Sequence, residues 1–341
     1  MIRAVFRALP EDFEVEEDLG FEPDGQGEHL LLWVEKRGAN TAWVAGQLAR
    51  WAGVAPAAVS WSGLKDRHAV TRQWFGVHLP RRVAPETGPD IEGAVVLARH
   101  WHGRKLRRGS HRGNRFAIML RAVEGDREGA DATLRAIAAG GVPNAFGEQR
   151  FGHGGGNVEA ARRWLSAARP ARLPPHRRAL LLGAARAWLF NQVLAARVGR
   201  GDWHQGIPGD CFQLDGRGSW FGPEPVIDEV LRARLERGEI HATGPLWGEG
   251  ASPAGDQAAM IEAAVTAAEP QLAEGLSRFG LRQERRALRV LPRDLRWRWA
   301  DEGTGDTLAL SFALPAGAYA TAVLAAFAQL DNAAAVADEG E

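Results

Sequence analysis

The chain has 341 residues, of which 45% are hydrophobic, and it carries 42 basic and 42 acidic residues. This length suggests two domains, and the hydrophobic content supports a core in each, so we expect a soluble globular protein. The one cysteine, Cys211, excludes an internal disulfide and a cysteine-cluster metal site, and it favours a reducing cytoplasm. No early apolar stretch follows a basic start, and no run approaches the roughly 18 apolar residues of a membrane span, so we expect neither secretion nor a membrane partner.

Alternating apolar residues in an acidic N-terminal region predict the first strand. Phe13 and Val15 alternate with acidic residues, which is the pattern of a strand with one buried face. Residues 29–36, HLLLWVEK, predict a second strand, and a helix follows it. The apolar face of this helix carries Val44, Leu48 and Trp51.

The segment 63–75, GLKDRHAVTRQWF, combines a flexible glycine, a carboxylate with basic neighbours and the start of a strand. Lys65 and Arg67 flank Asp66, and residues 73–79 form the strand pattern that leaves the site. A carboxylate between two cations stays ionised at neutral pH, as a nucleophile must. The alternative is a loop aspartate in a surface ion pair, which charge spacing by itself favours.

Two acid-free stretches are rich in basic residues although the net charge is zero. The first lies between Glu92 and Glu124, and its basic residues are Arg99, Arg104, Lys105, Arg107, Arg108, Arg112, Arg115 and Arg121. The second lies between Glu159 and Asp202, and its basic residues are Arg162, Arg163, Arg169, Arg172, Arg177, Arg178, Arg186, Arg197 and Arg200. Arginine forks match phosphate oxygens and released counterions favour binding, so each stretch is either a nucleic-acid contact or a solvated basic face.

Strands predicted at 93–98 and 115–120 complete an N-terminal sheet domain of the α/β or α+β class rather than a helical bundle. A glycine-rich segment, GVPNAFGEQRFGHGGGN, begins at residue 141, and it contains no Walker pattern. Strand patterns return at 287–299 and 307–315, and we expect the small, acidic tail after Asp331 to be frayed.

Helices dominate the region between the glycine-rich segment and the returning strands. They are predicted at 157–168, 178–198, 226–237 and 256–279. The helix over 180–198 is apolar almost all round, so we expect it in the core of a second domain. Asn191 and Gln192 of this helix are then buried residues with satisfied hydrogen bonds rather than a site.

The segment 63–75 closely resembles the active-site motif of the TruD family of tRNA pseudouridine synthases, Gly-x-Lys-Asp-[Lys/Arg]-His-Ala-x-Thr-x-Gln, and every fixed position is present. Further segments match the family in the family's order. They are EDFEVEEDLGFEPDGQGEHLLLWVEKRGANT at 11–41, GNRF at 113–116, GVPNAFGEQRFG at 141–152, LFNQ at 189–192, GRGSWF at 216–221 and LPAGAYAT at 314–321. Because these segments cover the chain from end to end, chance matching of one short motif is no serious alternative.

The resemblance implies a discontinuous catalytic domain, whereas the sequence by itself suggests two consecutive domains. Residues 1–140 and 294–341 would form a pseudouridine synthase domain on a mixed, largely antiparallel sheet. Residues 141–293 would be an inserted α/β TRUD domain. The expected class is therefore α/β (α+β) with an insertion.

The resemblance also implies an activity, the isomerisation of uridine-13 in the D-arm of tRNA, expected to be tRNA-Glu, to pseudouridine. Such an enzyme needs no cofactor and no metal, and we expect a cytoplasmic monomer. Asp66 would be the catalytic carboxylate. Whether it attacks C1′, adds to C6 or removes a sugar proton stays open at this point.

Further site residues follow from the resemblance, position by position. Arg7 matches the family's basic residue that pairs with the catalytic aspartate, and Lys65 and His68 support the motif. Phe13, Asn114, Phe116 and Tyr319 match residues that contact the aspartate or the target base; at 319 the family commonly has phenylalanine. An amide can hold a carboxylate in one rotamer, and a ring can stack on an unstacked uracil, although a strand-capping asparagine and core aromatics are the alternatives.

We expect contacts to the RNA backbone from Arg104, Lys105, Arg107, Arg108 and Arg150. Two functions of other classes remain as alternatives. A non-catalytic RNA-binding protein would show the same basic stretches without requiring Asp66. A metal-dependent hydrolase would use histidines, although histidines in a basic stretch are more often phosphate contacts or bystanders. Its candidate ligands are His68, His78, His100 and His102.

Overall fold

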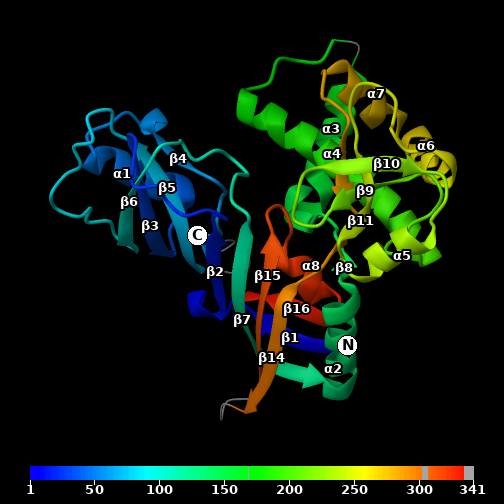
Figure 1. Ribbon diagram of the computed structural model, residues 1–341, viewed down its shortest axis with the longest axis horizontal. Coiled ribbons are helices and arrows are strands. Elements are labelled where there is room, and N and C mark those ends of the chain that lie inside the picture. The colour runs from blue at the N-terminus through cyan, green and yellow to red at the C-terminus, as the bar shows by residue number, and fades with distance from the viewer. Residues whose placement is uncertain (168, 302–305, 334–341) are drawn as a thin grey trace. The chain divides into compact units, whose positions relative to one another are not determined.

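The computed structural model describes the chain except for residues 168, 302–305 and 334–341. The expectation of a frayed tail after Asp331 falls mainly on residues that lie outside the described ones. The described chain forms two compact units, each with its own sheet and helices (Figure 1). Unit 1 comprises Met1–Arg135, Pro292–Ala320 and the chain from Phe327 onward; unit 2 comprises Ala136–Leu291 and Thr321–Ala326.

Unit 1 is built on a mixed sheet that has ten strands in the described part of the chain. They are β1 (Ile2–Phe6), β2 (Phe13–Asp18), β3 (His29–Arg37), β4 (Val59–Trp61), β5 (Val70–His78), β6 (Ala94–His102), β7 (Gly113–Gly125), β14 (Arg293–Asp301), β15 (Asp306–Pro315) and β16 (Ala328–Asn332). The main path runs β14-β15-β7-β2-β5-β3-β6. β2 and β5 are parallel, as are β1 and β16, whereas the other pairs are antiparallel. The predicted mixed, largely antiparallel sheet is confirmed.

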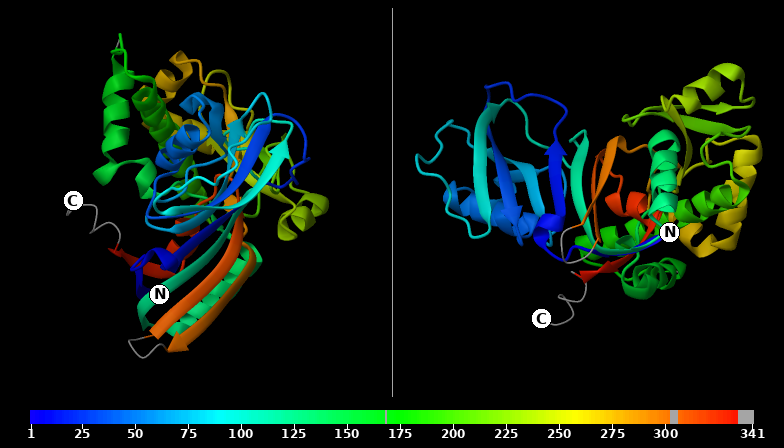
Figure 2. Two further views of the ribbon diagram at one scale, coloured as in Figure 1. Left: turned by 90° about the vertical axis from the view of Figure 1, so that its left-hand side faces the viewer. Right: turned by 90° about the horizontal axis from the view of Figure 1, so that it is seen from below.

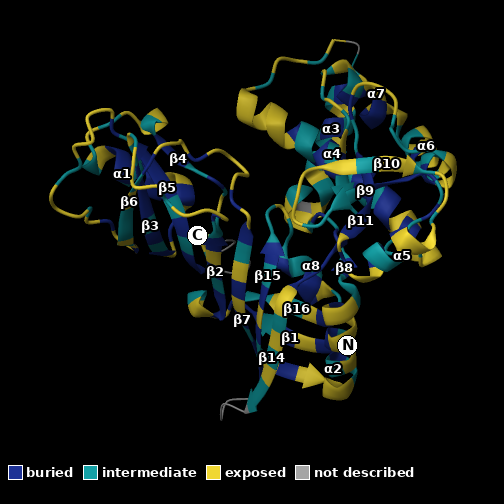
Figure 3. Ribbon diagram, viewed as in Figure 1, coloured by how far each residue is buried: buried dark blue, intermediate teal, exposed yellow. Residues whose placement is uncertain are grey.

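Helix α1 (Thr41–Trp51) covers one face of β3 and β5 (Figure 3). Val44 and Leu48 lie one turn apart, as the sequence pattern predicts, and both are fully buried. They belong to one apolar cluster with Leu32 and Phe75 of the two strands. This packing fixes the start of α1, and Thr41 at that start is the residue that reaches the loop after β4.

Helix α2 (Arg127–Gly140) was not predicted from the sequence. In unit 1 its Asp131 accepts hydrogen bonds from the indole Nε1 atoms of Trp297 (2.7 Å) and Trp299 (2.9 Å) on β14, so this part of α2 lies along that strand (Figure 2). The strand predicted at 287–299 is wrong as a single element. Pro292 cannot donate to a ladder, and the chain changes partner strands on either side of it.

Unit 2 contains a four-stranded sheet of order β10-β9-β11-β12 and a two-stranded pair β8-β13 among the described residues. The strands are β8 (Val142–Pro143), β9 (Asp210–Leu214), β10 (Trp220–Glu224), β11 (Ile240–Leu246), β12 (Glu284–Ala287) and β13 (Arg289–Val290). The helices are α3 (Gly156–Ser166), α4 (Pro175–Arg200), α5 (Glu229–Glu236), α6 (Asp256–Ala268) and α7 (Pro270–Arg278). The helix predicted at 256–279 is two helices, because Pro270 has no N–H and opens a new helix.

Short elements complete the described chain. They are α8 (Ala320–Ala325) and the 3₁₀ turns η1 (Pro10–Asp12), η2 (Pro56–Ala58), η3 (Glu148–Arg150) and η4 (His153–Gly155).

Helix α4 lies in the core of unit 2, as predicted. Its Leu181 and Leu189 are buried in a cluster with Leu165 of α3 and Leu276 of α7. Within the described residues it is also the one helix long and apolar enough to cross a membrane, with a mean hydropathy of 1.3 over a window that is 50% buried. The expectation that no run approaches a membrane span is therefore corrected: this buried core helix passes the same test of length and composition.

Candidate active site

The loop between β4 and β5, residues 62–69, carries Asp66 and is called the motif loop below. Side chains of α1 and β5 hold this loop by hydrogen bonds. Thr41 Oγ1 accepts a hydrogen bond from Lys65 N (3.0 Å) and donates one to Gln73 Oε1 (2.9 Å), while Gln73 Nε2 donates to Gly63 O (3.2 Å). Thr41 and Gln73 are buried, so water does not compete for these bonds. The loop therefore has a defined shape before any substrate arrives.

The Asp66 carboxylate is held at both oxygens. Arg7 Nη2 lies 2.8 Å from Oδ2, and His68 N donates to Oδ1 at 3.0 Å. The Asp66 side chain remains 24% exposed. The carboxylate is thus oriented by an ion pair and a backbone N–H, and a ligand can still reach it.

Arg7 is buried in an unusual backbone conformation. Its φ is 60°, in the left-handed region that a non-glycine residue rarely adopts, and its side chain is 7% exposed. The guanidinium carbon lies 4.7 Å from the ring centre of Phe6 and 4.5 Å from that of Phe13. Burial lowers the pKa of Arg7, and the Asp66 carboxylate opposes that shift. The structure therefore brings Arg7 to Asp66, the pair that the family resemblance implies, and stores backbone strain there.

Lys65 does not neutralise Asp66, contrary to the expectation from its position in the motif. Its Nζ forms a buried ion pair with Glu17 Oε2 at 2.6 Å, and Glu17 Oε1 accepts from Trp74 N at 3.3 Å. Arg67 Nε donates to Gly38 O at 3.4 Å. Adjacent residues in an extended loop point in different directions, so sequence neighbours are poor predictors of ion pairs. The cation on the carboxylate is Arg7, and Lys65 anchors the loop to β2.

Four phenylalanine rings form a row of contacts on the sheet that begins beside Arg7. Phe13 meets Phe6 edge-on at 5.3 Å and stacks on Phe116 at 6.0 Å, and Phe116 lies 5.4 Å from Phe312. Phe13 is 6% and Phe116 7% exposed. Both predicted base-contacting rings are thus mainly core residues, and either could offer only a small edge to a ligand in this conformation.

Asn114 and Tyr319 are placed less tightly than the rings. Asn114 pairs with Glu17 across β2 and β7, and its buried Oδ1 has no hydrogen-bond partner among the described residues. Tyr319 is half-buried in the turn before α8. The direct approach of Asn114 to Asp66 that the resemblance implies is not among the hydrogen bonds of the described residues.

Sequence reasoning missed a buried histidine beside the motif loop. A Cβ added to Gly63 would lie 3.3 Å from His111 Cε1 and 3.5 Å from Lys65 Nζ, so glycine allows these side chains to pack under the loop. Burial lowers the pKa of His111, Glu17 raises it and Lys65 lowers it. His111 lies among the basic residues of the first stretch, and composition by itself gives no sign that this histidine is buried beside the motif loop. Three further residues of the site were also not singled out, although the segments that match the family contain them. They are Glu17, Thr41 and Gln73.

The first basic stretch places exposed cations beside the motif loop. Residues 103–112, the basic loop, are anchored by buried Leu106 and bound to the motif loop by Gly109 N, which donates to Ser62 O at 2.7 Å. Ser62 and Ser110 share a further hydrogen bond of 3.3 Å. The exposed cations of this loop are Arg104, Lys105, Arg107 and Arg108. Their position on a loop bonded to the motif loop fits contacts to the backbone around a target nucleotide.

The second basic stretch is partly neutralised by acids of unit 2, which among the described residues pair with four of its nine arginines. Arg197 is buried between Asp202 (2.6 Å) and Asp210 (2.8 Å), and Arg162 pairs with Glu269. Arg186 and Arg200 also have acidic partners. The arginines of this stretch that stay exposed are Arg163, Arg169, Arg172, Arg177 and Arg178. The four paired arginines are therefore structural, whereas the five exposed ones remain available to a nucleic acid.

Arg150 is half-buried in the glycine-rich segment. Its guanidinium lies 5.5 Å from the Phe146 ring, and the Phe146 backbone is clamped by Asn191, whose Oδ1 accepts and Nδ2 donates at 2.9 Å each. Asn191 has satisfied hydrogen bonds, as predicted, but Asn191 and Gln192 are half-buried rather than buried. Arg286 stacks on the same ring at 4.2 Å. These contacts give the segment a structural role, and the RNA contact of Arg150 stays a prediction.

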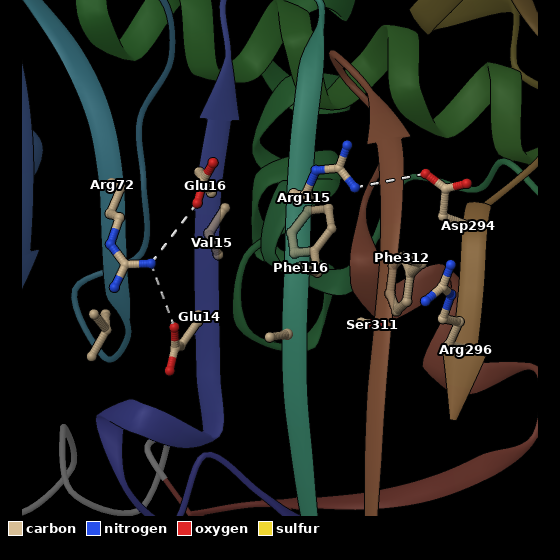
Figure 4. Close-up of a pocket in the computed structure, with 12 residues that line it drawn as sticks. Glu14, Val15, Glu16, Arg72, Arg115, Phe116, Asp294, Arg296, Ser311 and Phe312 are labelled. Carbon is tan, nitrogen blue, oxygen red and sulfur yellow. Dashed lines mark ion pairs between the residues drawn. The ribbon is translucent and has the colours of Figure 1, made fainter. Parts of the chain in front are cut away.

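A groove of about 430 Å³ lies across the middle strands of the unit 1 sheet (Figure 4). Its charged residues pair with one another: Arg72 lies 3.8 Å from Glu14 and from Glu16, and Arg115 lies 3.6 Å from Asp294. The groove does not include Asp66. Since acids and bases balance there, it lacks the excess positive charge that a phosphate backbone selects.

Two of the histidines proposed as metal ligands, His78 and His102, lie on either side of His29 in neighbouring strands. His78 stacks on His29 at 4.8 Å and His102 stacks on Phe21 at 5.0 Å. In the parts of the chain that the structure describes, no three His, Cys, Asp or Glu side chains form a metal site. The geometry therefore gives the metal-dependent hydrolase no candidate ligand set.

Comparisons with known proteins agree over nearly the whole chain. The family model described as tRNA pseudouridine synthase D (TruD) matches residues 2–159 and 158–327. The tRNA pseudouridine synthase D of Xanthomonas axonopodis pv. citri is 50% identical over 339 residues, 95% of this chain and 91% of that protein. The protein of the same name from Methylococcus capsulatus is 45% identical over 330 residues, 96% of this chain and 92% of that protein.

A solved structure shares the fold. The crystal structure of the putative tRNA pseudouridine synthase D (TruD) from Methanosarcina mazei matches with a TM-score of 0.70 and 22% identity, covering 95% of this chain and 93% of that one.

Proposed function

The chain belongs to the TruD family of tRNA pseudouridine synthases, and we propose that it isomerises uridine-13 in the D-arm of tRNA to pseudouridine with Asp66 as the catalytic carboxylate. Family membership supports the coarser statement, conversion of uridine to pseudouridine in tRNA. The proposal further includes tRNA-Glu as substrate and action as a cytoplasmic monomer without cofactor.

The reaction rearranges one nucleotide without redox change. The N1–C1′ glycosidic bond breaks, the uracil turns in the pocket and a C5–C1′ bond forms, while the proton of C5 is lost and N1 gains one. The target uridine must leave its stack, because neither C1′ nor C6 is open to a carboxylate inside folded RNA. The carboxylate roles that the residues allow are attack at C1′, addition to C6 and removal of a sugar proton.

The observation that carries the proposal is the Asp66 carboxylate itself. It is oriented through both oxygens by Arg7 and His68 N, yet 24% of its side chain is exposed. The pair with Arg7 differs from the surface ion pairs of this chain, such as Arg112 with Asp18, because its cation is buried at 7% exposure while the carboxylate stays open to a ligand. The adjoining basic loop supplies exposed cations for the RNA backbone around this carboxylate.

The test is the Asp66→Asn variant. We expect it to abolish isomerisation and to leave tRNA affinity within a few-fold of wild type, since one carboxylate supplies the chemistry and many cations supply binding. Pseudouridine should be mapped along total tRNA from a deletion strain complemented with either form.

The outcomes separate the parts of the proposal. Restoration at position 13 by the wild type, and not by Asp66→Asn, supports both the substrate position and the catalytic assignment. Restoration at another position keeps the reaction and overturns the substrate. Substantial turnover by Asp66→Asn overturns the catalytic assignment, and a wild type that binds tRNA without making pseudouridine would identify a binding protein.

A further inference from the structure

Lys36, near the end of β3, is a buried cation with no role in the chemistry described so far. The residue is 1% exposed, and its Nζ donates to the carbonyl oxygens of Ala39 and Asp66, each at 2.8 Å. Among the described residues no carboxylate lies within ion-pair distance of it. An ammonium that is buried without a direct counter-ion costs free energy, and such groups concentrate at functional sites.

The carbonyl that Lys36 holds belongs to the residue whose side chain is held by Arg7 and by His68 N. His68 N holds the carboxylate relative to its own loop, and Arg7 holds it relative to the end of β1. Lys36 instead holds the Asp66 peptide, through its carbonyl oxygen, relative to β3. The second acceptor, Ala39, lies just before α1, whose Thr41 holds Lys65 N. Lys36 therefore ties the peptide of Asp66 to β3 and to the start of α1.

The charged groups that act on Lys36 come from the motif loop. The Asp66 carboxylate favours the charged form of Lys36 and the Lys65 ammonium disfavours it. The register partners, Thr71 on β5 and Ala94 on β6, carry no charge. Burial is the largest influence and lowers the pKa of Lys36 to about 8. The ammonium is therefore charged at neutral pH and loses its proton slightly above it.

We propose that Lys36 is a positioning residue for Asp66, which holds the Asp66 peptide where the carboxylate reaches the flipped uridine and keeps a positive charge beside it. The inference rests on the proposed function. The neutral amine retains two N–H donors, so loss of the proton removes mainly the charge, whereas Lys36→Met removes both the charge and the hydrogen bonds.

The experiment measures single-turnover rate at saturating protein, tRNA affinity and melting temperature for wild type and Lys36→Met between pH 6.5 and 9. We expect the variant to react roughly 100-fold more slowly at pH 7 with tRNA affinity within a few-fold, as a misplaced reacting group does. The wild-type rate should fall as pH rises through about 8, and the variant should lack that decline.

Leu134→Ala is the matched control, because Leu134 is fully buried on α2, and the side-chain hydrogen bonds of α2 among the described residues do not reach the motif loop. It should lower the melting temperature and leave the single-turnover rate of the folded protein unchanged. If Lys36→Met does not fold, Lys36→Gln, which keeps an N–H donor on a shorter side chain, takes the same measurements. The wild-type pH profile needs no variant.

A Lys36 variant that reacts within threefold of wild type, or that keeps the decline near pH 8, overturns this inference and leaves the proposed function intact. A slow Lys36 variant matched by an equally slow Leu134→Ala also overturns it, because general loosening would then explain both. A wild type that forms no pseudouridine overturns the proposed function, and this inference with it.

Discussion

Replacing Arg7 by methionine should slow catalysis strongly in a protein that still folds. Methionine keeps much of the buried apolar volume beside Phe6 and Phe13 but removes the Nη2 donor that lies 2.8 Å from Asp66 Oδ2. Since the Asp66 side chain is 24% exposed, water replaces part of the missing bond, and we expect a decrease of about 1–3 kcal/mol in unfolding free energy. The strain at φ 60° persists, because any residue but glycine shares it.

The effect on turnover follows from the weaker orientation of the carboxylate. With Oδ2 unheld, Asp66 can rotate, and misplacement of a reacting group costs roughly 100-fold, or about 2.7 kcal/mol of activation free energy. Single-turnover rates at saturating enzyme isolate this step from tRNA binding. Arg7→Lys keeps the charge without the planar fork and should give an intermediate rate.

Arg121→Met supplies the matched control for Arg7→Met. Arg121 Nη2 lies 2.8 Å from Asp12 Oδ1, and Asp12 is 1% exposed, so this variant strands a more deeply buried carboxylate away from Asp66. It should lose about 3–5 kcal/mol of stability and keep the wild-type rate while folded. An Arg7→Met protein that turns over within threefold of wild type would refute the reasoning, as would an Arg121→Met protein that is equally slow.

Three further predictions follow from the same site. Replacing the four exposed cations of the basic loop together should flatten the slope of log affinity against log salt by roughly 0.7–0.9 for each phosphate that the loop no longer neutralises, and an unchanged slope would place that loop away from RNA. Phe116→Ala removes a ring that is only 7% exposed, so it should lower the free energy of unfolding by about 3–5 kcal/mol in thermal or chemical denaturation. If the folded fraction of this variant reacts at the wild-type rate, stacking of Phe116 on the uracil is refuted. Tyr319→Phe should leave the rate nearly unchanged. The pKa of Lys36 is about 8 in the folded protein and 10.5 for a free lysine side chain, so between these pH values the unfolded chain binds more protons than the folded one. Lys36 therefore makes the free energy of unfolding rise with pH in this range. Lys36→Met should lack that rise when denaturation is measured across the same range.

Local patterns predicted the elements around the site well. Alternation at Phe13 and Val15 predicted β2, and the spacing of Val44 and Leu48 predicted α1, because one buried face leaves a period in the sequence. The parallel pairing of Ile2–Phe6 with Ala328–Asn332 had no such signal. It joins the two ends of the described chain, and nothing local specifies which strands meet.

Charge patterns predicted ion pairs poorly. Within the motif, Lys65 was expected at the carboxylate, but its partner is Glu17 on β2, and the cation on Asp66 comes from Arg7. In the second basic stretch the neutralising acids include Asp210 and Glu269, which lie outside the stretch in sequence. An ion pair depends on which strands and helices become neighbours, so it emerges only with the tertiary structure.

The arrangement around Asp66 explains how a carboxylate can be both fixed and reactive. An ionised carboxylate has about four lone-pair sites, and among the described residues Arg7 and His68 N take one on each oxygen. Lys36 holds the backbone instead of the carboxylate, while Lys65 is neutralised by Glu17 and does not lock it with a second ion pair. Each oxygen therefore keeps acceptor capacity for a substrate atom. A second cation placed directly on the carboxylate would orient it further but would weaken it as a nucleophile or base, because a positive charge in direct contact stabilises the ionised ground state.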